Sequence, residues 1–283
     1  MIKKPWVVFF TAVFSAAALL VVPRLAPANS YQVFKNIVYA RRDSGALRAD
    51  IYRPMGEGLR AVVVVIHGGA WLGGAKGQLG TLARTLASQG YVAMAINYRL
   101  APVYPFPAQI DDCHEAVQWI RDHGHRYNMD SDRVGAWGYS SGGHLAALLG
   151  MTNPHLHAVV AGGAPCDFRP LGLDNPMLVF WLGATRGENP QVYREASPAH
   201  FVSPEAPPTF FYHGGRDRIV PLSEPATMVK KLNRLGVPAE VYVAGNQGHA
   251  RTILHRESVE KAMAFLDEHL QPRPASITLD QTQ

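Results

Sequence analysis

The sequence predicts an α/β protein with a mostly parallel central sheet and helices on both faces of that sheet. Residues 61–69, AVVVVIHGG, form a continuous apolar run of the kind that a strand buried on both faces requires. From there to residue 270, β-rich apolar runs alternate with helical patterns, as expected for parallel strands joined by helical crossovers. The 283 residues are 47% hydrophobic and 17% charged, which is an ordinary globular composition.

The predicted elements follow one another in a regular order. Residues 31–41 and 47–54 are expected to pair as a hairpin ahead of the first buried strand. One helix is expected at 77–90, closing on a glycine, and the next starts after Pro107 and runs to residue 124. The remaining predicted strands are 91–99, 132–140, 157–165, 208–215 and 239–245, and the remaining helices are 141–151, 225–236 and 252–270.

Residues 1–28 have the organisation of an export segment and are set aside from the fold. Lys3 and Lys4 precede an apolar run at 6–22, and Ala26-Pro27-Ala28 fits a small-x-small cleavage site. This order predicts a secretory signal peptide and therefore a periplasmic or secreted protein. The apolar run is also at the short edge of a bilayer span, so an uncleaved N-terminal membrane anchor is the alternative.

The folded domain is expected to span 29–270, followed by a disordered tail at 271–283. Within it, residues 167–207 are rich in Pro, Gly and aromatic side chains and interrupt the alternation between two strands. Insertions of this kind in an open α/β sheet lie above the carboxyl ends of the strands, where ligands bind. We interpret the segment as a small cap or pocket wall, with a plain long loop as the alternative.

Composition and spacing argue against several classes of partner. The formal charge is +5, but the basic residues are scattered, so nucleic-acid binding is not expected. No metal is expected either, because His114-Glu115 lacks the second histidine of a zinc helix and has Gln118 in its place. Cys113 and Cys166 are compatible with one disulfide in an oxidising compartment or with two buried free thiols.

A G-x-S-x-G pentapeptide at 138–142 lies between a predicted strand and a predicted helix. In this context the motif is a sharp turn that exposes a serine hydroxyl, and the flanking Gly138 and Gly142 keep neighbouring backbone clear. The spacing makes Ser140 the candidate nucleophile. Ser141 follows at the helix start, where its backbone N–H is positioned to donate to a developing oxyanion.

A second glycine-rich stretch, His67-Gly68-Gly69-Ala70-Trp71, ends the first long buried strand. Glycines there let the backbone turn its N–H groups toward a substrate oxygen, so the amides of Gly68 and Gly69 are candidate oxyanion donors. His67 is expected to support this loop through a hydrogen bond. A phosphate-binding loop is disfavoured, because Ala75 stands where such a loop needs lysine.

The acid and the base that a serine nucleophile requires follow two later strands. Asp217 comes shortly after the strand at 208–215, and His249 lies in a glycine-bearing loop after the last strand. Imidazole takes the serine proton, and a carboxylate fixes the imidazole tautomer. Asp167, which also follows a strand, is the alternative acid.

Four aromatic residues are expected to line the substrate pocket. Trp71 and Tyr139 flank the motifs, and Phe180 and Trp181 lie in the 167–207 insertion.

With these motifs in place, the sequence resembles the α/β-hydrolase superfamily over nearly its whole mature length. The stretches HGGAW, NYRLAP, FPAQIDD, GYSSGGHLAAL and HGGRDRIVP are similar to those of hormone-sensitive-lipase-like esterases, especially the acetyl/feruloyl-type carboxylesterase group. This resemblance implies an α/β-hydrolase fold, no cofactor, Ser140, Asp217 and His249 as a catalytic triad, and the amides of Gly68, Gly69 and Ser141 as the oxyanion hole. The departure is Ala70, where many relatives carry a third glycine.

The expected function is therefore that of a serine carboxylesterase acting on small acyl or aryl esters through an acyl-enzyme. The alternative enzymatic function is amide or formamide hydrolysis, as in kynurenine-formamidase-like enzymes, because the same triad cleaves amides. A hydrolase fold retained only as a binding module is a third hypothesis. Such modules usually lack a triad member, and this sequence supplies all three.

Overall fold

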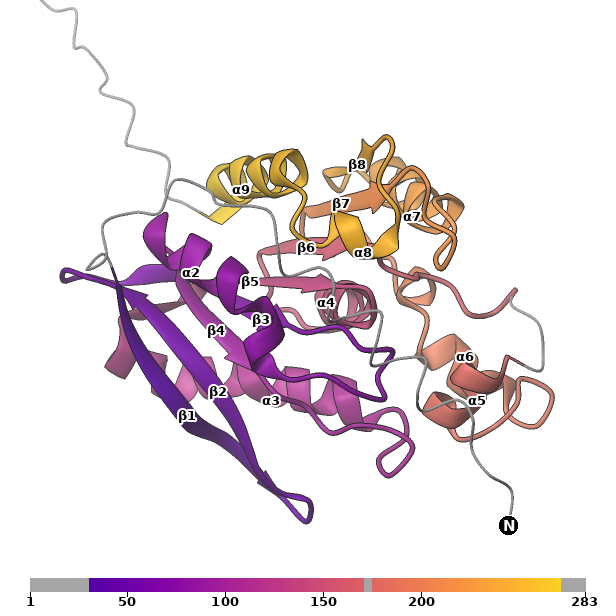
Figure 1. Cartoon of the computed structure of the whole chain (residues 1–283), viewed down its shortest axis with the longest axis horizontal. Coiled ribbons are helices and arrows are strands. Elements are labelled where there is room, and N and C mark those ends of the chain that lie inside the picture. Colours follow the sequence, from indigo (N-terminus) through magenta and orange to yellow (C-terminus); the bar gives the residue numbers. More distant parts are fainter. Residues whose placement is uncertain (1–30, 171–174, 271–283) are drawn as a thin grey trace, which may run out of the picture.

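A computed structural model describes residues 31–170 and 175–270, so the predicted export segment and the predicted tail lie outside the described residues. One eight-stranded sheet runs through this part of the chain in the order β1-β2-β4-β3-β5-β6-β7-β8 (Figure 1). The strands are β1 (Tyr31–Arg42), β2 (Gly45–Pro54), β3 (Arg60–Ile66), β4 (Val92–Ile96), β5 (Met129–Tyr139), β6 (Ala158–Gly162), β7 (Thr209–Gly214) and β8 (Ala239–Ala244).

The strand directions match the predicted mostly parallel sheet. The predicted hairpin forms, with β1 antiparallel to β2 and β2 antiparallel to β4. From β4 through β8 every neighbouring pair is parallel. Because parallel strands end at the same edge of a sheet, the loops that follow β3, β5, β7 and β8 come together there.

Helices cover both faces of the sheet, as the alternating pattern predicts. They are α2 (Gly80–Ser88), α3 (Ala108–His123), α4 (Ser141–Thr152), α7 (Ser223–Arg234) and α9 (Arg256–Leu270). Along β3, Val62 and Val64 join the core beneath α3, α4 and α7, whereas Val63 and Val65 join the core beneath α2 and α9. The continuous apolar run of β3 is thus explained by burial on both faces.

Several element boundaries differ from the sequence prediction by a few residues, and two of the differences have a visible cause or consequence. The strand β5 begins at Met129 instead of residue 132, because its first residues pair with Arg60 and Ala61 before a register shift. The helix expected at 252–270 begins later, as α9 at Arg256, and a separate short helix, α8 (His249–Thr252), precedes it. The break places His249 on the short helix, at the sheet edge.

The 167–207 insertion contains α5 (Pro176–Leu182), α6 (Pro190–Glu195) and a 3-10 turn, η3 (Pro198–His200). Figure 1 shows α5 and α6 outside the sheet, to one side of it. Each of these short helices begins with a proline, preceded by an asparagine whose side chain accepts backbone N–H groups. The insertion is therefore locally ordered in its described residues.

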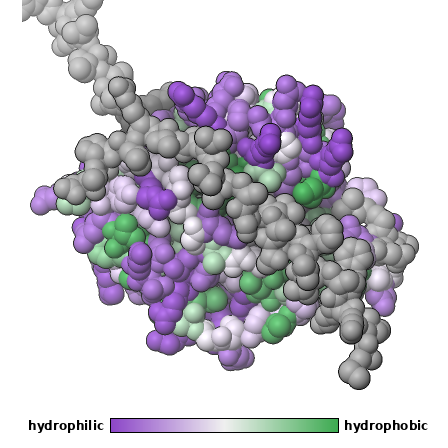
Figure 2. Space-filling view, viewed as in Figure 1, coloured by the Kyte–Doolittle hydropathy of each residue, from purple (hydrophilic) through white to green (hydrophobic). Residues whose placement is uncertain are grey.

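The two cysteines, Cys113 and Cys166, are free thiols and both are buried. Among the described residues, no helix is both long enough and apolar enough to cross a membrane. Figure 2 shows a mixed surface in which hydrophilic and hydrophobic residues are interspersed on the face in view.

Candidate active site

The turn between β5 and α4 holds Ser140 in a strained backbone conformation. Its φ is 56° and its ψ is −122°, in a region that side-chain-bearing residues rarely adopt. The turn is closed by two glycines. A Cβ on Gly138 would lie 2.0 Å from the Gly142 carbonyl oxygen, and a Cβ on Gly142 would lie 2.1 Å from the Ile66 carbonyl oxygen. The G-x-S-x-G motif is thus explained by close backbone approach.

Three side chains from separate loops meet at this turn. The Nε2 atom of His249 is 2.9 Å from the Ser140 Oγ, and its Nδ1 atom is 2.6 Å from Asp217 Oδ2. An ionised carboxylate only accepts hydrogen bonds, so Nδ1 carries the imidazole proton and Nε2 is left to accept from the serine hydroxyl. This arrangement makes Nε2 a base in contact with a nucleophile.

Asp217 is fixed from several directions. Its Oδ1 accepts the backbone N–H groups of Ile219, at 2.8 Å, and Val220, at 3.0 Å. Burial by itself raises the pKa of this carboxyl, but the hydrogen bonds from His249 and from the two amides outweigh it and lower the pKa. Asp217 therefore stays ionised and acts as the acceptor for the imidazole.

The alternative acid is not in this position. Asp167 forms an ion pair with Arg169, with 2.6 Å between the two side chains, whereas the imidazole of His249 faces Asp217. Residue 249 is held further by Tyr139, whose hydroxyl donates to the His249 carbonyl oxygen.

The glycine-rich loop after β3 lies against the nucleophile. A Cβ on Gly68 would be 2.8 Å from the Tyr139 carbonyl oxygen and 3.4 Å from Ser140 Cβ. Gly69 has a φ of 125°, and a side chain there would meet the Gly73 carbonyl oxygen at 2.1 Å. Ser141 occupies the first position of α4, where backbone N–H groups have no intrahelical acceptor. Gly68 and Ser141 thus lie against or within the nucleophile turn, and Gly69 follows Gly68 in the facing loop.

The base of the glycine-rich loop is supported by His67, as expected. Its imidazole stacks on the Tyr98 ring, with 4.2 Å between centroids, and its Nδ1 lies 2.8 Å from the Gly68 carbonyl oxygen. The Tyr98 hydroxyl donates to the His67 carbonyl oxygen at 2.9 Å.

The aromatic residues expected to line the pocket divide into two groups. Trp71, Tyr139 and Trp181 are at most 2% exposed, so they pack behind the surface of the site and support it. Phe180 is 57% exposed on α5 and presents its ring to solvent. Phe180 and Trp181 are neighbours on the seven-residue helix α5 and therefore point in different directions. The sequence does not say which of the two faces the protein.

Two buried histidines beside the site were not identified from the sequence. His144, on α4, accepts a hydrogen bond from the indole N–H of Trp71 at 3.1 Å. His213, at the end of β7, has its Nε2 2.9 Å from the Val220 carbonyl oxygen and 3.4 Å from Asp217 Oδ2. The available signals are that His144 follows Ser140 by one helical turn and that His213 precedes Asp217 by four residues.

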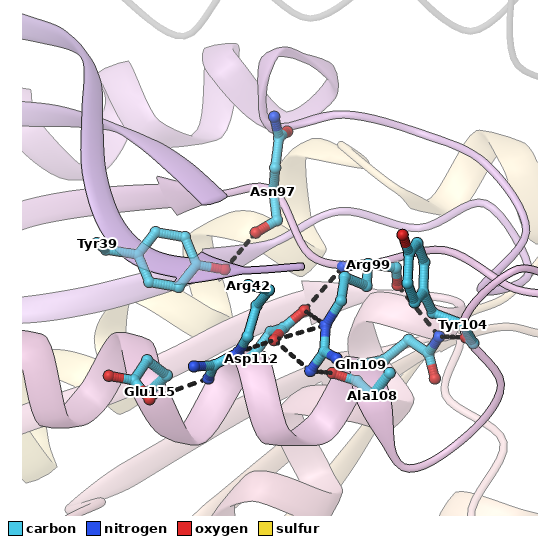
Figure 3. A network of polar contacts seen from close by, with 9 residues as sticks. All are labelled: Tyr39, Arg42, Asn97, Arg99, Tyr104, Ala108, Gln109, Asp112 and Glu115. Atoms are coloured by element: carbon cyan, nitrogen blue, oxygen red, sulfur yellow. Dashed lines mark hydrogen bonds and ion pairs between the residues drawn. The ribbon is translucent and has the colours of Figure 1, made fainter. Parts of the chain in front are cut away.

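A second polar region is separate from the triad. Figure 3 shows Arg99 and Arg42 converging on Asp112, whose side chain is fully buried, with closest distances of 2.7 Å and 3.5 Å. Beside it is a depression of about 580 Å³, lined by Arg42, Arg99, Asp111, His114, Glu115, Gln118 and Asn153. Its arginines are already paired with carboxylates. Among the described residues, no three metal-ligating side chains are grouped closely enough to hold an ion.

Comparison with known proteins places the chain in a family. The family model BD-FAE matches residues 49–232, which is more than half of the 283-residue chain. The chain belongs to the BD-FAE family.

Two relatives of this BD-FAE protein carry names of ester hydrolases. It is 33% identical over 205 residues to the probable carboxylic ester hydrolase LipM of Mycobacterium tuberculosis (strain ATCC 25618 / H37Rv), covering 65% of this chain and 48% of LipM. It is 35% identical over 102 residues to an arylesterase of Saccharolobus solfataricus, covering 36% of this chain and 33% of that protein. This BD-FAE protein therefore spans about half the length of LipM.

Solved structures share its fold. Esterase 2 of Thermogutta terrifontis superposes with a TM-score of 0.74 at 23% identity, covering 89% of this chain and 100% of that one. A truncated carbohydrate esterase from gut microbiota gives a TM-score of 0.77 at 24% identity, covering 85% and 97%. Together with the sheet order, these likenesses confirm the α/β-hydrolase fold, and the family match confirms the resemblance to the esterase group.

Two buried histidines of this BD-FAE protein predict how its stability depends on pH. Burial lowers the pKa values of His67 and His144 from the ordinary 6.5 to about 4. Between pH 6.5 and 4 the unfolded chain therefore binds protons that the folded chain does not bind, so the free energy of unfolding falls as the pH falls. Each imidazole contributes about 3 kcal/mol over this range. Urea unfolding at pH 7.5 and at pH 5 measures this decrease in the free energy of unfolding.

The matched variants are His144→Gln, which should make the pH dependence shallower, and His200→Gln at an exposed histidine, which should leave it unchanged. Equal free energies of unfolding at pH 7.5 and pH 5 in the unsubstituted protein would contradict two neutral buried imidazoles.

Proposed function

We propose that this BD-FAE protein is a serine carboxylesterase that hydrolyses small acyl or aryl esters through an acyl-enzyme intermediate. The observation that carries the proposal is the unbroken hydrogen-bonded line from the Ser140 hydroxyl through His249 to Asp217. The esterase names of LipM and of the arylesterase support it.

In the acylation step, the Ser140 Oγ attacks the ester carbonyl carbon while its proton passes to His249 Nε2. The imidazolium that forms is stabilised by the ionised Asp217, at 2.6 Å from its other nitrogen. Negative charge develops on the former carbonyl oxygen. The candidate donors to that oxygen are the backbone N–H groups of Gly68, Gly69 and Ser141, which need no reorganisation as the charge appears.

The tetrahedral intermediate then breaks its carbon–oxygen bond to the leaving alcohol. His249 returns the proton to that alcohol, and the acyl group remains on the Ser140 oxygen. In deacylation a water molecule acts as the nucleophile in place of serine. It attacks the acyl carbon and gives its proton to His249. Release of the carboxylic acid restores the serine hydroxyl and the neutral imidazole.

The competing functions have less support. The same triad geometry serves amide or formamide hydrolysis, but the names of LipM and of the arylesterase refer to esters. A non-catalytic binding module has no need for a base held 2.9 Å from a serine hydroxyl in a strained turn.

We also propose that the protein works outside the cytoplasm, in the periplasm or as a secreted protein. This rests on the order of basic residues, apolar run and small-residue cleavage site within residues 1–28. Retention of that segment as a membrane anchor is the competing proposal, and the molecular mass of the mature protein distinguishes the two.

The proposed reaction predicts a specific response to loss of the nucleophile. Ser140→Ala should lower kcat for p-nitrophenyl acetate by at least about 10⁴-fold with little change in stability, because only the attacking atom is lost. Ser88→Ala, the same change on α2, is the control. A panel that adds an aryl amide and N-formylkynurenine separates the functions. Faster turnover of the formamide than of the ester would favour the alternative, and equal ester turnover by Ser140→Ala would overturn the esterase assignment.

The insertion predicts a preference for short acyl chains. Trp181 on α5 stacks on Trp71 of the glycine-rich loop, with 3.7 Å between ring centroids, so the insertion packs directly against that loop. We therefore expect kcat/KM to fall from acetyl and butyryl to palmitoyl p-nitrophenyl esters, by tenfold or more, on the order expected when several methylenes are left without a pocket. Activity that rises with chain length would show that the insertion leaves a long groove.

A further inference from the structure

The glycine-rich loop that faces Ser140 is held in a conformation that its own residues disfavour. Gly69, Ala70 and Trp71 have φ values of 125°, 54° and 60°, so three consecutive residues lie in the left-handed region and two of them carry side chains. Such a conformation persists only where surrounding contacts over-determine it. The question is which contacts hold this loop. Inside the loop, the Gly69 carbonyl oxygen accepts the backbone N–H groups of Leu72, at 3.1 Å, and Gly73, at 3.0 Å.

Trp71 connects the loop to the rest of the protein. Its ring stacks on the Trp181 ring at 3.7 Å with 5° between the planes, and its Nε1–H donates to His144 Nδ1 at 3.1 Å. Its carbonyl oxygen accepts the Ala101 N–H at 3.0 Å. The indole is 2% exposed, so its N–H has no access to water as a substitute acceptor.

The hydrogen bonds of His144 determine its tautomer. An indole nitrogen only donates, so Nδ1 of His144 is the unprotonated acceptor and Nε2 carries the hydrogen. That Nε2–H donates to the Ala196 carbonyl oxygen at 2.7 Å, at the end of α6. The backbone N–H of His144 donates to the Ser140 carbonyl oxygen at 2.9 Å. One neutral imidazole thus joins the nucleophile turn, the glycine-rich loop and the insertion.

Trp181 is fixed from its other side. Its Nε1–H donates to Gln109 Oε1 at 3.0 Å, and the Gln109 amide in turn donates to the carbonyl oxygens of Arg99 and Tyr104 (Figure 3). The polar atoms of both indoles are therefore satisfied, and neither ring is free to tilt without leaving a buried group unpaired.

We propose that Trp71, His144 and Trp181 form a clamp that holds the amides of the glycine-rich loop in position for the transition state. His144 and Trp71 act as positioning residues, since both are buried and act through the loop backbone. The catalytic part of this inference rests on the proposed esterase function. Its structural part does not depend on that function, because restraint of the loop by these three side chains can be measured without a substrate.

Release of the clamp would let the loop relax from its left-handed conformation. Its amides would then lie off the line of the developing oxyanion, which affects the transition state more than substrate binding. We therefore expect kcat to fall while KM changes little.

The first test uses Trp71→Phe, which keeps an aromatic ring on Trp181 and deletes the N–H donor. We expect kcat for p-nitrophenyl acetate to fall by about 10- to 100-fold with KM within about threefold, less than the loss of a whole oxyanion donor. Trp119→Phe, the same change at a half-buried position on α3, is the control and should keep full activity. Equal kcat values for the two variants would overturn the clamp.

The second test separates the two hydrogen bonds of His144. His144→Asn keeps an acceptor where Nδ1 meets Trp71, whereas His144→Gln keeps a donor where Nε2 meets Ala196 but offers Trp71 no acceptor. We expect His144→Asn to retain more kcat than His144→Gln by about tenfold. A purely structural role predicts instead that kcat follows the melting temperature of each variant, and equal kcat values would overturn the assignment. The comparison of His144→Asn with His144→Gln tests the clamp even if Trp71→Phe fails to fold.

Hydrogen exchange gives a readout that does not depend on activity. Backbone amides in residues 67–73 should exchange at least about tenfold faster in Trp71→Phe and His144→Gln than in the unsubstituted protein. Unchanged exchange would overturn the clamp. If the unsubstituted protein hydrolyses no ester, the proposed function is wrong, and faster loop exchange in the variants would still support the clamp.

Discussion

The site depends on one backbone constraint, the left-handed conformation of Ser140 between β5 and α4. It turns the hydroxyl out of the strand edge and toward the imidazole of His249, 2.9 Å away. The turn is possible only where three backbone segments approach without side chains, and Gly138, Gly142 and Gly68 supply those positions. A methyl group at any of them would meet backbone closer than van der Waals contact allows, so the turn and the loop facing it must form together.

The rest of the fold serves to bring loops to that turn. The parallel strands from β3 to β8 end at one edge of the sheet. Close packing on both faces of the sheet holds these strands in place. Asp217 reaches the site from the loop after β7, and His249 from the short helix after β8. The match to the BD-FAE family model covers residues 49–232, which include Ser140 and Asp217, and ends before His249.

Much of this was readable from the sequence because the motifs are local. The apolar run of β3 and the glycines around Ser140 each follow from a few adjacent residues, and Asp217 and His249 each follow shortly after a predicted strand. The contacts of His144 were not readable. They depend on Trp71 and Ala196, which lie 73 and 52 residues away in the chain, and no periodicity connects side chains across such a separation.

Other differences between the sequence prediction and the structure have similar causes. The burial of Trp181 and the exposure of Phe180 depend on how α5 docks, which short-range spacing does not specify. The early start of β5 depends on pairing with β3. In each case tertiary contacts override a local pattern.

The most direct measurement is mass spectrometry after incubation with a p-nitrophenyl alkylphosphonate, a reagent that a serine nucleophile captures as a stable adduct. We expect one adduct per chain, located on Ser140 by peptide mapping, and labelling slowed by at least about 10³-fold in His249→Ala, because the serine then lacks its base. An adduct on another residue, or labelling that proceeds equally well in Ser140→Ala, would contradict Ser140 as the nucleophile.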